Sequence, residues 1–442
     1  MTDLTRDSDR TVSAEFLRDV IRGKHVSEAD PQGLRLCGAV VCGRLDLAWI
    51  NASTPIELWH CLLDSGVDAQ HAKLPALILE DCELSHGDSP ALDATGLVVG
   101  ALSLRRSVLT GSTPQGAVRL IGARISGQLA CTGARIRNDS GPAISADRLR
   151  VEGTVFLNEE FRAEGSGSSS TIRLSGADLS SLDCTAAIVR NNNGPALSAE
   201  YLRIARTLFL DGHFEAAGEH AVVLNLGGAA ITGRLVIIPD RLVNTTNPTA
   251  LVRLTDMTYA SEPVRVSRDE WLGLLRHGTP EYAAQPYQHY AAALRSAGHD
   301  REARQVLMAQ RRDQIDRALS GRAERLWARL TGLVLGYGYQ PWRALIGLLA
   351  VVVLSAVLAV VLGGRGALTQ VRGSGGCSVI DQVGVGLDVG SPLVSTGARA
   401  RCDATNTGAG QVLTSLGWLF RLLAWGFATL FIAGFTGAVR KT

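Results

Sequence analysis

The sequence predicts a mainly β protein, built as a β-helix or solenoid of short stacked strands and followed by a small α-helical hairpin and two transmembrane helices. Three observations support this fold class. Related phrases recur at a fixed interval in the first half of the chain, short runs there alternate apolar with polar residues, and two long apolar runs lie near the end. Together they indicate a repeat domain joined to a membrane module.

The repeats are clearest in two phrases, GPAISADRLRVEGTVFL at residues 141–157 and GPALSAEYLRIARTLFL at residues 194–210. A third copy begins near Pro90, so that Pro90, Pro142 and Pro195 lie 52 and 53 positions apart. Self-similarity at a fixed period is typical of repeat architectures, in which each unit buries its apolar face against its neighbours. We therefore expect residues 31–260 to form one β-helix-like repeat domain.

The repeated unit has the pattern of strands. Runs such as LILEDCEL, VRLIGARI and IRLSGADL alternate apolar with polar residues and then break at Gly, Asn, Asp or Pro. Alternation with a period of two places successive side chains on opposite faces of a strand. Stacked coils satisfy this pattern, because each coil covers the apolar face of the next and pairs with its backbone. A unit of about 53 residues then corresponds to two or three coils, whose handedness the pattern leaves open.

Both ends of such a solenoid expose strand edges that invite pairing with other chains, so each end needs a cover. At the first end, residues 1–30 are assigned as a cap, because SAEFLRDVIRGKHV at residues 13–26 predicts a short amphipathic helix. Residues 261–335 are assigned as an α-helical connector. Within it, the sequence predicts a helical hairpin broken at Gly298, with Asp300 as the N-cap of the second helix.

Residues 336–442 are assigned as a membrane module, with helices at 344–362 and 416–439 and a loop at 363–415. At about 1.5 Å per residue, either apolar run can cross a hydrocarbon core of about 30 Å. The second run contains Arg421, whose guanidinium would reach the lipid headgroups by snorkelling. The residues expected to anchor the module at the lipid interfaces are Trp342, Arg343, Arg421, Arg440 and Lys441.

Flanking charge predicts the orientation of this module. Arginines are frequent before the first apolar run, and Arg440 and Lys441 follow the second, so the positive-inside rule places both termini in the cytoplasm, as in a multi-pass protein of the cell membrane. The start MTDLTRDSDRTVSAEF is polar and does not resemble a secretory signal. The loop at 363–415 then faces the oxidising exterior, where we expect Cys377 and Cys402 to form a disulfide.

The sequence offers few residues for chemistry. Asp381 and Asp388 in the loop are candidates for the lining of a pore, because a short helix between two membrane helices is the plan of simple cation channels. The phrase DGHFEAAGEH at residues 211–220 has the pattern of a solvated loop rather than of a metal site. No catalytic, cofactor-binding or metal-binding residue is assigned. This favours a protein that is not an enzyme, and an enzymatic function stays open as the alternative.

Composition and charge limit the partners that we expect. The formal net charge of +2 is close to neutral and argues against general nucleic-acid binding. Membrane lipid and an unknown protein are the expected partners. Small residues at Ala424 and Ala428, and again at Ala433 and Gly437, allow close helix packing, either within one chain or in a homo-oligomer.

Two phrases, GYGYQPWRAL at residues 336–345 and AWGFATLFIAGFTGAVRK at residues 424–441, carry a family resemblance together with the Gly- and Ala-rich coils. The chain resembles a group of bacterial, largely actinobacterial, membrane proteins, in which a β-helical or pentapeptide-repeat-like cytoplasmic region precedes a two-helix C-terminal module. The resemblance implies the same plan here, and it implies the label that the group often carries, membrane-associated oxidoreductase. It supplies no catalytic residues or cofactor.

These observations favour an integral membrane protein that presents a cytoplasmic β-solenoid as a scaffold or protein-interaction surface. One alternative is an oligomeric module that conducts ions or perturbs the membrane and is gated by the solenoid. The other alternative is an oxidoreductase, which rests on the family resemblance alone.

Overall fold

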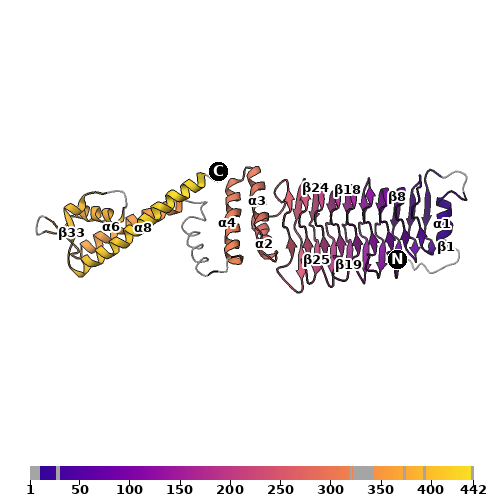
Figure 1. Ribbon diagram of the computed structural model, residues 1–442, viewed down its shortest axis with the longest axis horizontal. Coiled ribbons are helices and arrows are strands. Elements are labelled where there is room, and N and C mark those ends of the chain that lie inside the picture. Colours follow the sequence, from indigo (N-terminus) through magenta and orange to yellow (C-terminus); the bar gives the residue numbers. More distant parts are fainter. Residues whose placement is uncertain are drawn as a thin grey trace. The chain divides into compact units, whose positions relative to one another are not determined.

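The structure, a computed structural model, describes residues 10–25, 30–318, 321, 342–371, 375–391 and 395–439, with side chains as far as residue 433. The chain forms two compact units, Met1–Leu307 and Met308–Thr442. The first unit contains a parallel β-solenoid of about nine turns, and the second contains two long apolar helices (Figure 1). The fold class predicted from the sequence is therefore confirmed.

Three parallel sheets run along the solenoid, and from β2 onward each coil adds strands first to sheet B, then to sheet A and then to sheet C. Sheet A consists of β1 (Thr11–Ser13), β3 (Val40–Cys42), β6 (Leu62–Leu63), β9 (Glu83–His86), β12 (Val108–Gly111), β16 (Arg135–Asn138), β19 (Arg162–Gly165), β22 (Ile188–Asn191), β25 (Glu215–Gly218) and β29 (Arg241–Asn244). Sheet B consists of β2 (Leu34–Cys37), β5 (Ile56–Trp59), β8 (Lys73–Glu80), β11 (Val98–Ser103), β14 (Arg124–Ile125), β15 (Leu129–Ala130), β18 (Arg150–Phe156), β21 (Asp178–Asp183), β24 (Arg203–Leu210), β27 (Ala230–Ile231), β28 (Arg234–Ile237) and β31 (Thr258–Tyr259). Sheet C consists of β4 (Leu45–Asp46), β7 (Val67–Asp68), β10 (Leu92–Asp93), β13 (Val118–Arg119), β17 (Ile144–Ser145), β20 (Ile172–Arg173), β23 (Leu197–Ser198), β26 (Leu224–Asn225) and β30 (Val252–Arg253).

The interior of the solenoid is made of aliphatic ladders, in which similar side chains lie above one another on successive coils. One inward ladder of sheet B consists of Leu77, Leu102, Leu129, Val155, Leu182, Leu208 and Leu235. None of these side chains is more than 3% exposed. Because each coil repeats the same inward set, the apolar positions of the sequence persist while the outward positions change.

The register of sheet B relates the coils to the sequence repeat. Val98 pairs with Lys73 on the coil before it and with Arg124 on the coil after it, which lie 25 and 26 positions away. Two coils therefore account for the repeat of about 53 residues, at the lower end of the predicted two or three coils.

An alternation of asparagine and glycine on sheet A explains why the repeat unit contains two coils. Gly165 pairs with Asn191, and Gly218 pairs with Asn244. A Cβ atom on Gly165 would lie 2.6 Å from Oγ1 of Thr171, so only glycine fits there. The coil with asparagine and the coil with glycine thus differ, and one of each makes up a repeat unit.

The helix α1 (Ala14–Ile21) covers the first coil of the solenoid. Ala14 and Leu17 are buried against core residues of that coil, and Arg18 forms an ion pair with Asp46 of β4. The helix lies within the segment in which the sequence predicts one. The short strand β1 before it extends sheet A by pairing with β3.

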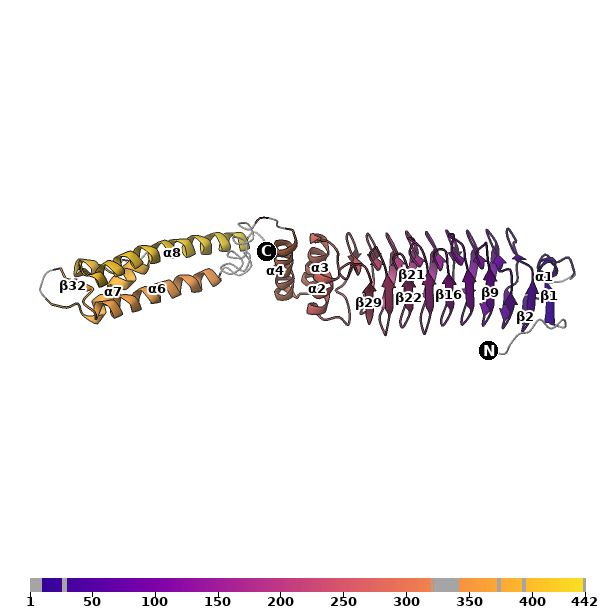
Figure 2. The same ribbon diagram turned by 90° about the horizontal axis from the view of Figure 1, so that it is seen from below.

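The other end of the solenoid is covered by α2 (Arg268–His277) and α3 (Ala284–Ser296) (Figure 2). These helices satisfy backbone groups of the last coil. The N–H groups of Leu251 and Val252 donate to the carbonyl of Gly278 at 2.9 and 2.8 Å, and the N–H of Tyr259 donates to Nε2 of His289 at 2.8 Å. The open strand edge is thus paired rather than exposed.

The predicted hairpin corresponds to α3 and α4 (Asp300–Arg317), and Gly298 between them has a positive φ of 84°. The prediction that Asp300 is the N-cap of the second helix was wrong. Asp300 is already helical, and the carbonyl of His299 accepts the N–H groups of Glu302 and Ala303. The helix α2 lies within the segment assigned as an α-helical connector, in front of the predicted hairpin.

The second unit consists mainly of α6 (Trp342–Gly363), α7 (Val379–Gly390) and α8 (Gly408–Val439). A hairpin of β32 (Leu368–Gln370) and β33 (Cys402–Ala404) and a 3-10 helix, η3 (Ala398–Ala400), complete it. α6 and the Gly408–Ala433 part of α8 are each long and apolar enough to cross a membrane. The helix α6 is close to the bounds predicted for the first apolar span, whereas α8 begins eight residues before the predicted start at 416.

Candidate functional site

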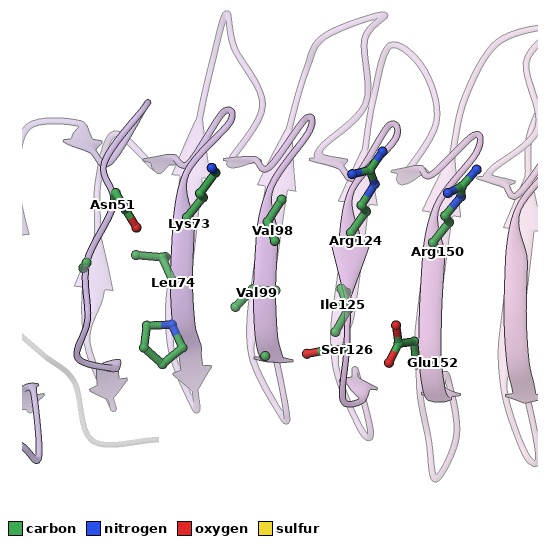
Figure 3. A pocket seen from close by; sticks show the side chains of 13 residues that line it. Asn51, Lys73, Leu74, Val98, Val99, Arg124, Ile125, Ser126, Arg150 and Glu152 are labelled. Atoms are coloured by element: carbon green, nitrogen blue, oxygen red, sulfur yellow. The ribbon is translucent and has the colours of Figure 1, made fainter.

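One outward ladder of sheet B carries a row of cationic side chains. From β8 to β24 it consists of Lys73, Val98, Arg124, Arg150, Asp178 and Arg203. Figure 3 shows the first four of these side chains next to one another on successive strands. Together with Arg148, which lies at the adjoining corner, the cations of this ladder define a surface that we call the basic row. Its members are Lys73, Arg124, Arg148, Arg150 and Arg203.

The strands orient these cations by burying the residue that follows each of them. Leu74, Ile125 and Val151 point into the core and are at most 5% exposed. Because side chains of a strand alternate between its two faces, the preceding basic residue must point outward. The sequence contained this signal, since the phrases GARI, RLRV and YLRI each place an arginine directly before a core residue. The sequence alone did not show that these arginines lie on one ladder.

The cations of the basic row make no ion pairs within the described part of the chain, as is also true of Arg135 and Arg162 on sheet A. Other cations of the solenoid do pair with anions of a neighbouring coil, as Arg119 does with Asp93 at 2.9 Å and Arg106 does with Asp81. The bidentate contact of Arg106 lowers the pKa of the Asp81 carboxyl below its usual value. The five members of the basic row form no ion pair with any described residue. Their charges are therefore available to a ligand.

Two adjoining grooves follow the basic row. A groove of about 620 Å³ crosses β8, β11, β14 and β18, and a groove of about 650 Å³ follows the corner between sheets C and B. Arg124 and Arg150 line both grooves, so the two grooves adjoin. The anionic residues that line them are Glu152 and Asp178.

Exposed aromatic side chains stand at both ends of the basic row. Trp49, which is 75% exposed, stacks on His71 with the ring centroids 4.3 Å apart. At the other end, Tyr201 is 72% exposed. A Cβ atom on Gly228 of the next coil would lie 2.6 Å from Cδ1 of Tyr201, so the ring lies against a position that must be glycine. These aromatic rings are held in place by neighbouring coils while their outer faces remain open.

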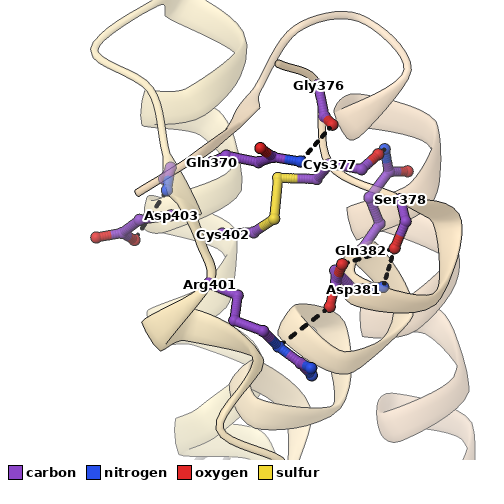
Figure 4. The surroundings of a disulfide bond; sticks show 10 residues. Gln370, Gly376, Cys377, Ser378, Asp381, Gln382, Arg401, Cys402 and Asp403 are labelled. Atoms are coloured by element: carbon purple, nitrogen blue, oxygen red, sulfur yellow. Dashed lines mark hydrogen bonds and ion pairs between the residues drawn. A yellow bond between two sulfur atoms is a disulfide. The ribbon is translucent and has the colours of Figure 1, made fainter. Parts of the chain in front are cut away.

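The C-terminal unit contains the other residues that the sequence singled out. Cys377 and Cys402 are joined by a disulfide across the loop, with their Cα atoms 6.1 Å apart (Figure 4). Asp381, in the first turn of α7, accepts a hydrogen bond from Ser378 Oγ at 2.6 Å and lies 3.3 Å from Nε of Arg401. Each of these contacts ties the start of α7 to the loop around the disulfide.

Asp388 lies near the other end of α7 and is only 8% exposed. Its carboxylate accepts the backbone N–H of Thr396. Asp381 and Asp388 are thus held by different partners at opposite ends of one helix, and the structure does not bring them together.

Glycine residues let α7 pack closely on α6. A Cβ atom on Gly386 would lie 2.5 Å from Cα of Ala356, and Ser355 Oγ donates to the carbonyl of Gly386 at 2.9 Å. Gly363 at the end of α6 is close to Gln382, and Gly390 is close to Ser355. The helix α7 therefore runs back along the C-terminal half of α6, in the opposite direction.

The expected anchors lie at different depths in the two apolar helices. Trp342 and Arg343 are exposed on the first turn of α6. Because α8 begins at Gly408, Arg421 lies 13 residues inside it and is exposed there. Arg440 and Lys441 lie outside the described residues. The expectation of a solvated loop at 211–220 was wrong in part, because this segment contains β25 and the buried Phe214 and Ala216. His213 is exposed and contacts Asp240 at 3.1 Å, and no group of metal-binding residues occurs among the described residues.

No protein family, curated protein or solved structure matches this chain. The comparisons therefore supply no evidence for the bacterial origin or the oxidoreductase activity that the sequence resemblance implies. The basic row and the apolar helices are the features of the described residues that bear on function.

Proposed function

We propose that this chain is an integral membrane protein whose solenoid presents the basic row as a docking surface for a partner protein. The observation that carries this proposal is the row of unpaired cations between the exposed rings of Trp49 and Tyr201. Tryptophan, tyrosine and arginine are the residues most enriched among the energetic hot spots of protein interfaces. The rings of Trp49 and Tyr201 lie against neighbouring coils, so they lose little conformational freedom on binding.

The location that fits this proposal is the cell membrane, with both termini and the solenoid in the cytoplasm and the disulfide loop outside. The bonded pair Cys377 and Cys402 supports an oxidising environment for the loop. Six cysteines of the solenoid are unpaired, including the exposed Cys37, which suits a reducing compartment. Arginines before α6 favour the same orientation.

An ion-conducting or membrane-perturbing module is the second candidate function. The observation that favours it is the direction of α7, which runs back along α6 as re-entrant helices do in channels. Planar-bilayer recording of the purified full chain tests this candidate. A current that Asp388→Asn abolishes would support conduction, whereas a silent bilayer would remove it.

The oxidoreductase activity implied by the sequence resemblance is the third candidate. It requires a redox group, so the purified full chain should then show the absorbance of a flavin or a nicotinamide. A protein that shows neither absorbance would remove most of this candidate.

Photo-crosslinking in intact cells tests the docking proposal directly. A photo-reactive amino acid replaces Val98, inside the basic row, or Val108, which points outward from sheet A. We expect the Val98 position to yield an adduct with one defined protein. The double change Arg124→Glu with Arg150→Glu should reduce that adduct about tenfold, because like charges across an interface cost several kcal/mol. Equal adduct yields from both positions, or an adduct yield that does not change on charge reversal, would contradict the proposal.

A further inference from the structure

We propose that the ligand of the basic row is an extended acidic peptide segment of about nine residues, which lies across the strands of sheet B along the solenoid axis. This inference rests on the proposed docking function and adds the chemistry and the spacing of the bound segment.

The charge of the surface selects an acidic ligand. Five cations and two anions line the two grooves, which gives a local charge of 5 − 2 = +3. The cations are the members of the basic row, and the anions are Glu152 and Asp178. The whole chain of 442 residues carries only +2. This surface thus carries a local positive charge, which would raise the encounter rate of an acidic partner.

The pattern of the charges selects a ligand of mixed sequence over a uniform polyanion. Asp178 lies on the ladder between Arg150 and Arg203, and Val98 lies between Lys73 and Arg124. A nucleic acid or polyphosphate would place a negative charge against Asp178 at a cost in electrostatic energy. A peptide can instead place a cation opposite Asp178 and an apolar residue opposite Val98.

The spacing of the coils fits an extended peptide. Neighbouring strands of a sheet lie about 4.8 Å apart, so the five steps from Lys73 to Arg203 span about 24 Å. Every second residue of an extended peptide faces the same way, and these residues lie about 6.6 Å apart. Five residues on one face of a nine-residue peptide therefore span about 26 Å, which matches the length of the row.

Matching the two spacings gives a binding register. The first residue of the peptide faces Lys73, the third faces Val98, and the fifth lies between Arg124 and Arg150. At about 20 Å the seventh residue faces Asp178, and the ninth lies near Arg203. The peptide that complements this row is Glu-Ser-Val-Ser-Glu-Ser-Lys-Ser-Glu, with serine at the positions that face away.

Binding of this peptide to the full chain, measured by fluorescence anisotropy in detergent, tests the inference. The matched control exchanges the first and seventh residues and so has the same composition and charge, Lys-Ser-Val-Ser-Glu-Ser-Glu-Ser-Glu. We expect the first peptide to bind at least about tenfold more tightly, because the control sets like charges against Lys73 and Asp178. Equal affinities would overturn the inference.

Variants of the chain test whether the peptide binds at the basic row. Arg124→Gln with Arg150→Gln should remove the preference between the two peptides, whereas Arg135→Gln with Arg162→Gln should leave it unchanged. The control pair also consists of arginines that pair on adjacent coils, but on sheet A. A loss of preference in both double variants would place the binding elsewhere and overturn the inference.

A nine-nucleotide single-stranded DNA serves as the third probe. If it bound more tightly than the first peptide and lost affinity in the Arg124→Gln with Arg150→Gln variant, the row would be a nucleic-acid site and the inference would be overturned. The docking proposal is tested separately, by the crosslinking experiment with Val98 and Val108. An adduct at Val98 combined with equal peptide affinities would retain the docking function and remove only the acidic nine-residue ligand.

Discussion

At the scale of single residues, Asn191 satisfies backbone groups that belong to two coils. Its Nδ2 donates to the carbonyl of Ser169 at 2.7 Å and to that of Pro195 at 3.0 Å, while its Oδ1 accepts the N–H of Asn193 at 2.9 Å. Asn138 and Asn244 make equivalent bonds one repeat away in each direction. The asparagine side chain therefore joins two adjacent coils by hydrogen bonds.

The change Asn191→Ala should lower the free energy of unfolding by about 1–3 kcal/mol, because it leaves buried carbonyl groups without a donor. The measurement is the urea midpoint of the β-sheet circular dichroism signal of the full chain. Asn192→Ala is the control, since Asn192 is the next residue in the strand's connection and its side chain is exposed. A midpoint shift equal to that of the control would show that the side-chain hydrogen bonds of Asn191 do not contribute to stability.

Burial should make two cysteines of the solenoid unreactive. It raises the pKa of Cys131 to about 12, and it raises the pKa of Cys184 as well. At pH 8 neither side chain forms the thiolate that alkylation requires, whereas the exposed Cys37 should react. Mass spectrometry of the alkylated chain checks this. Rapid modification of Cys131 without unfolding would contradict the burial.

The same pKa shift predicts how stability depends on pH. Above about pH 9 the thiol of Cys131 ionises in the unfolded chain but stays protonated in the folded one, so the unfolded state binds fewer protons. The contribution of this residue to stability is then lost progressively as the pH rises from about 9 toward 12. Urea midpoints of the Cys131→Ala variant should decline less over this range than those of the parent chain.

At the scale of elements, α2 protects the last coil of the solenoid. Trp271 is 1% exposed and meets the ring of Tyr259, which ends an inward ladder of sheet B, edge-on at 6.3 Å. Ser267 and Glu270 form a capping box that fixes the start of the helix. The position of α2 thus depends on one large buried side chain and one local motif.

The change Trp271→Ala should destabilise this cap by about 3–5 kcal/mol and should expose the edge of the last coil to other molecules. We expect the variant to self-associate in sedimentation velocity, at concentrations where the parent chain has one size. Leu272→Ala, on the more exposed side of α2, is the control. A variant with unchanged sedimentation would show that α2 is dispensable as a cover.

The disulfide should stabilise the loop of the C-terminal unit and leave the solenoid unaffected. Cys377 and Cys402 are 25 positions apart, and closing such a loop contributes about 3 kcal/mol. Replacing both by serine should therefore lower the thermal midpoint of the helical signal while the β signal keeps its midpoint. Cys37→Ser is the control. Equal shifts of both signals would contradict the division into two units.

At the scale of the whole molecule, the sequence was sufficient for the architecture because solenoids repeat their inward residues. Ladders such as the one through Leu102 and Leu182 recur every coil, so their apolar pattern is visible along the chain. The apolar helices were equally visible, because residues 344–362 of α6 form an uncharged, mainly apolar run. The start of α8 was placed too late, since its first turns contain glycine, threonine and glutamine.

The basic row could not be predicted, because it depends on register between coils rather than on any local phrase. Lys73, Arg124 and Arg203 are far apart in the chain, and loops of unequal length separate them. Only the pairing of each strand with the next shows that they lie on one line. The Asn–Gly alternation was missed for the same reason, since its meaning lies in the contact between coils.

We propose that this chain anchors its solenoid on one side of a membrane and exposes the disulfide loop on the other. Labelling of intact cells with a membrane-impermeant maleimide after mild reduction measures both parts together. We expect Cys377 and Cys402 to become labelled in intact cells, and Cys37 to become labelled only after the cells are permeabilised. Labelling of Cys37 in intact cells, or a loop pair that stays unlabelled until permeabilisation, would contradict the claim.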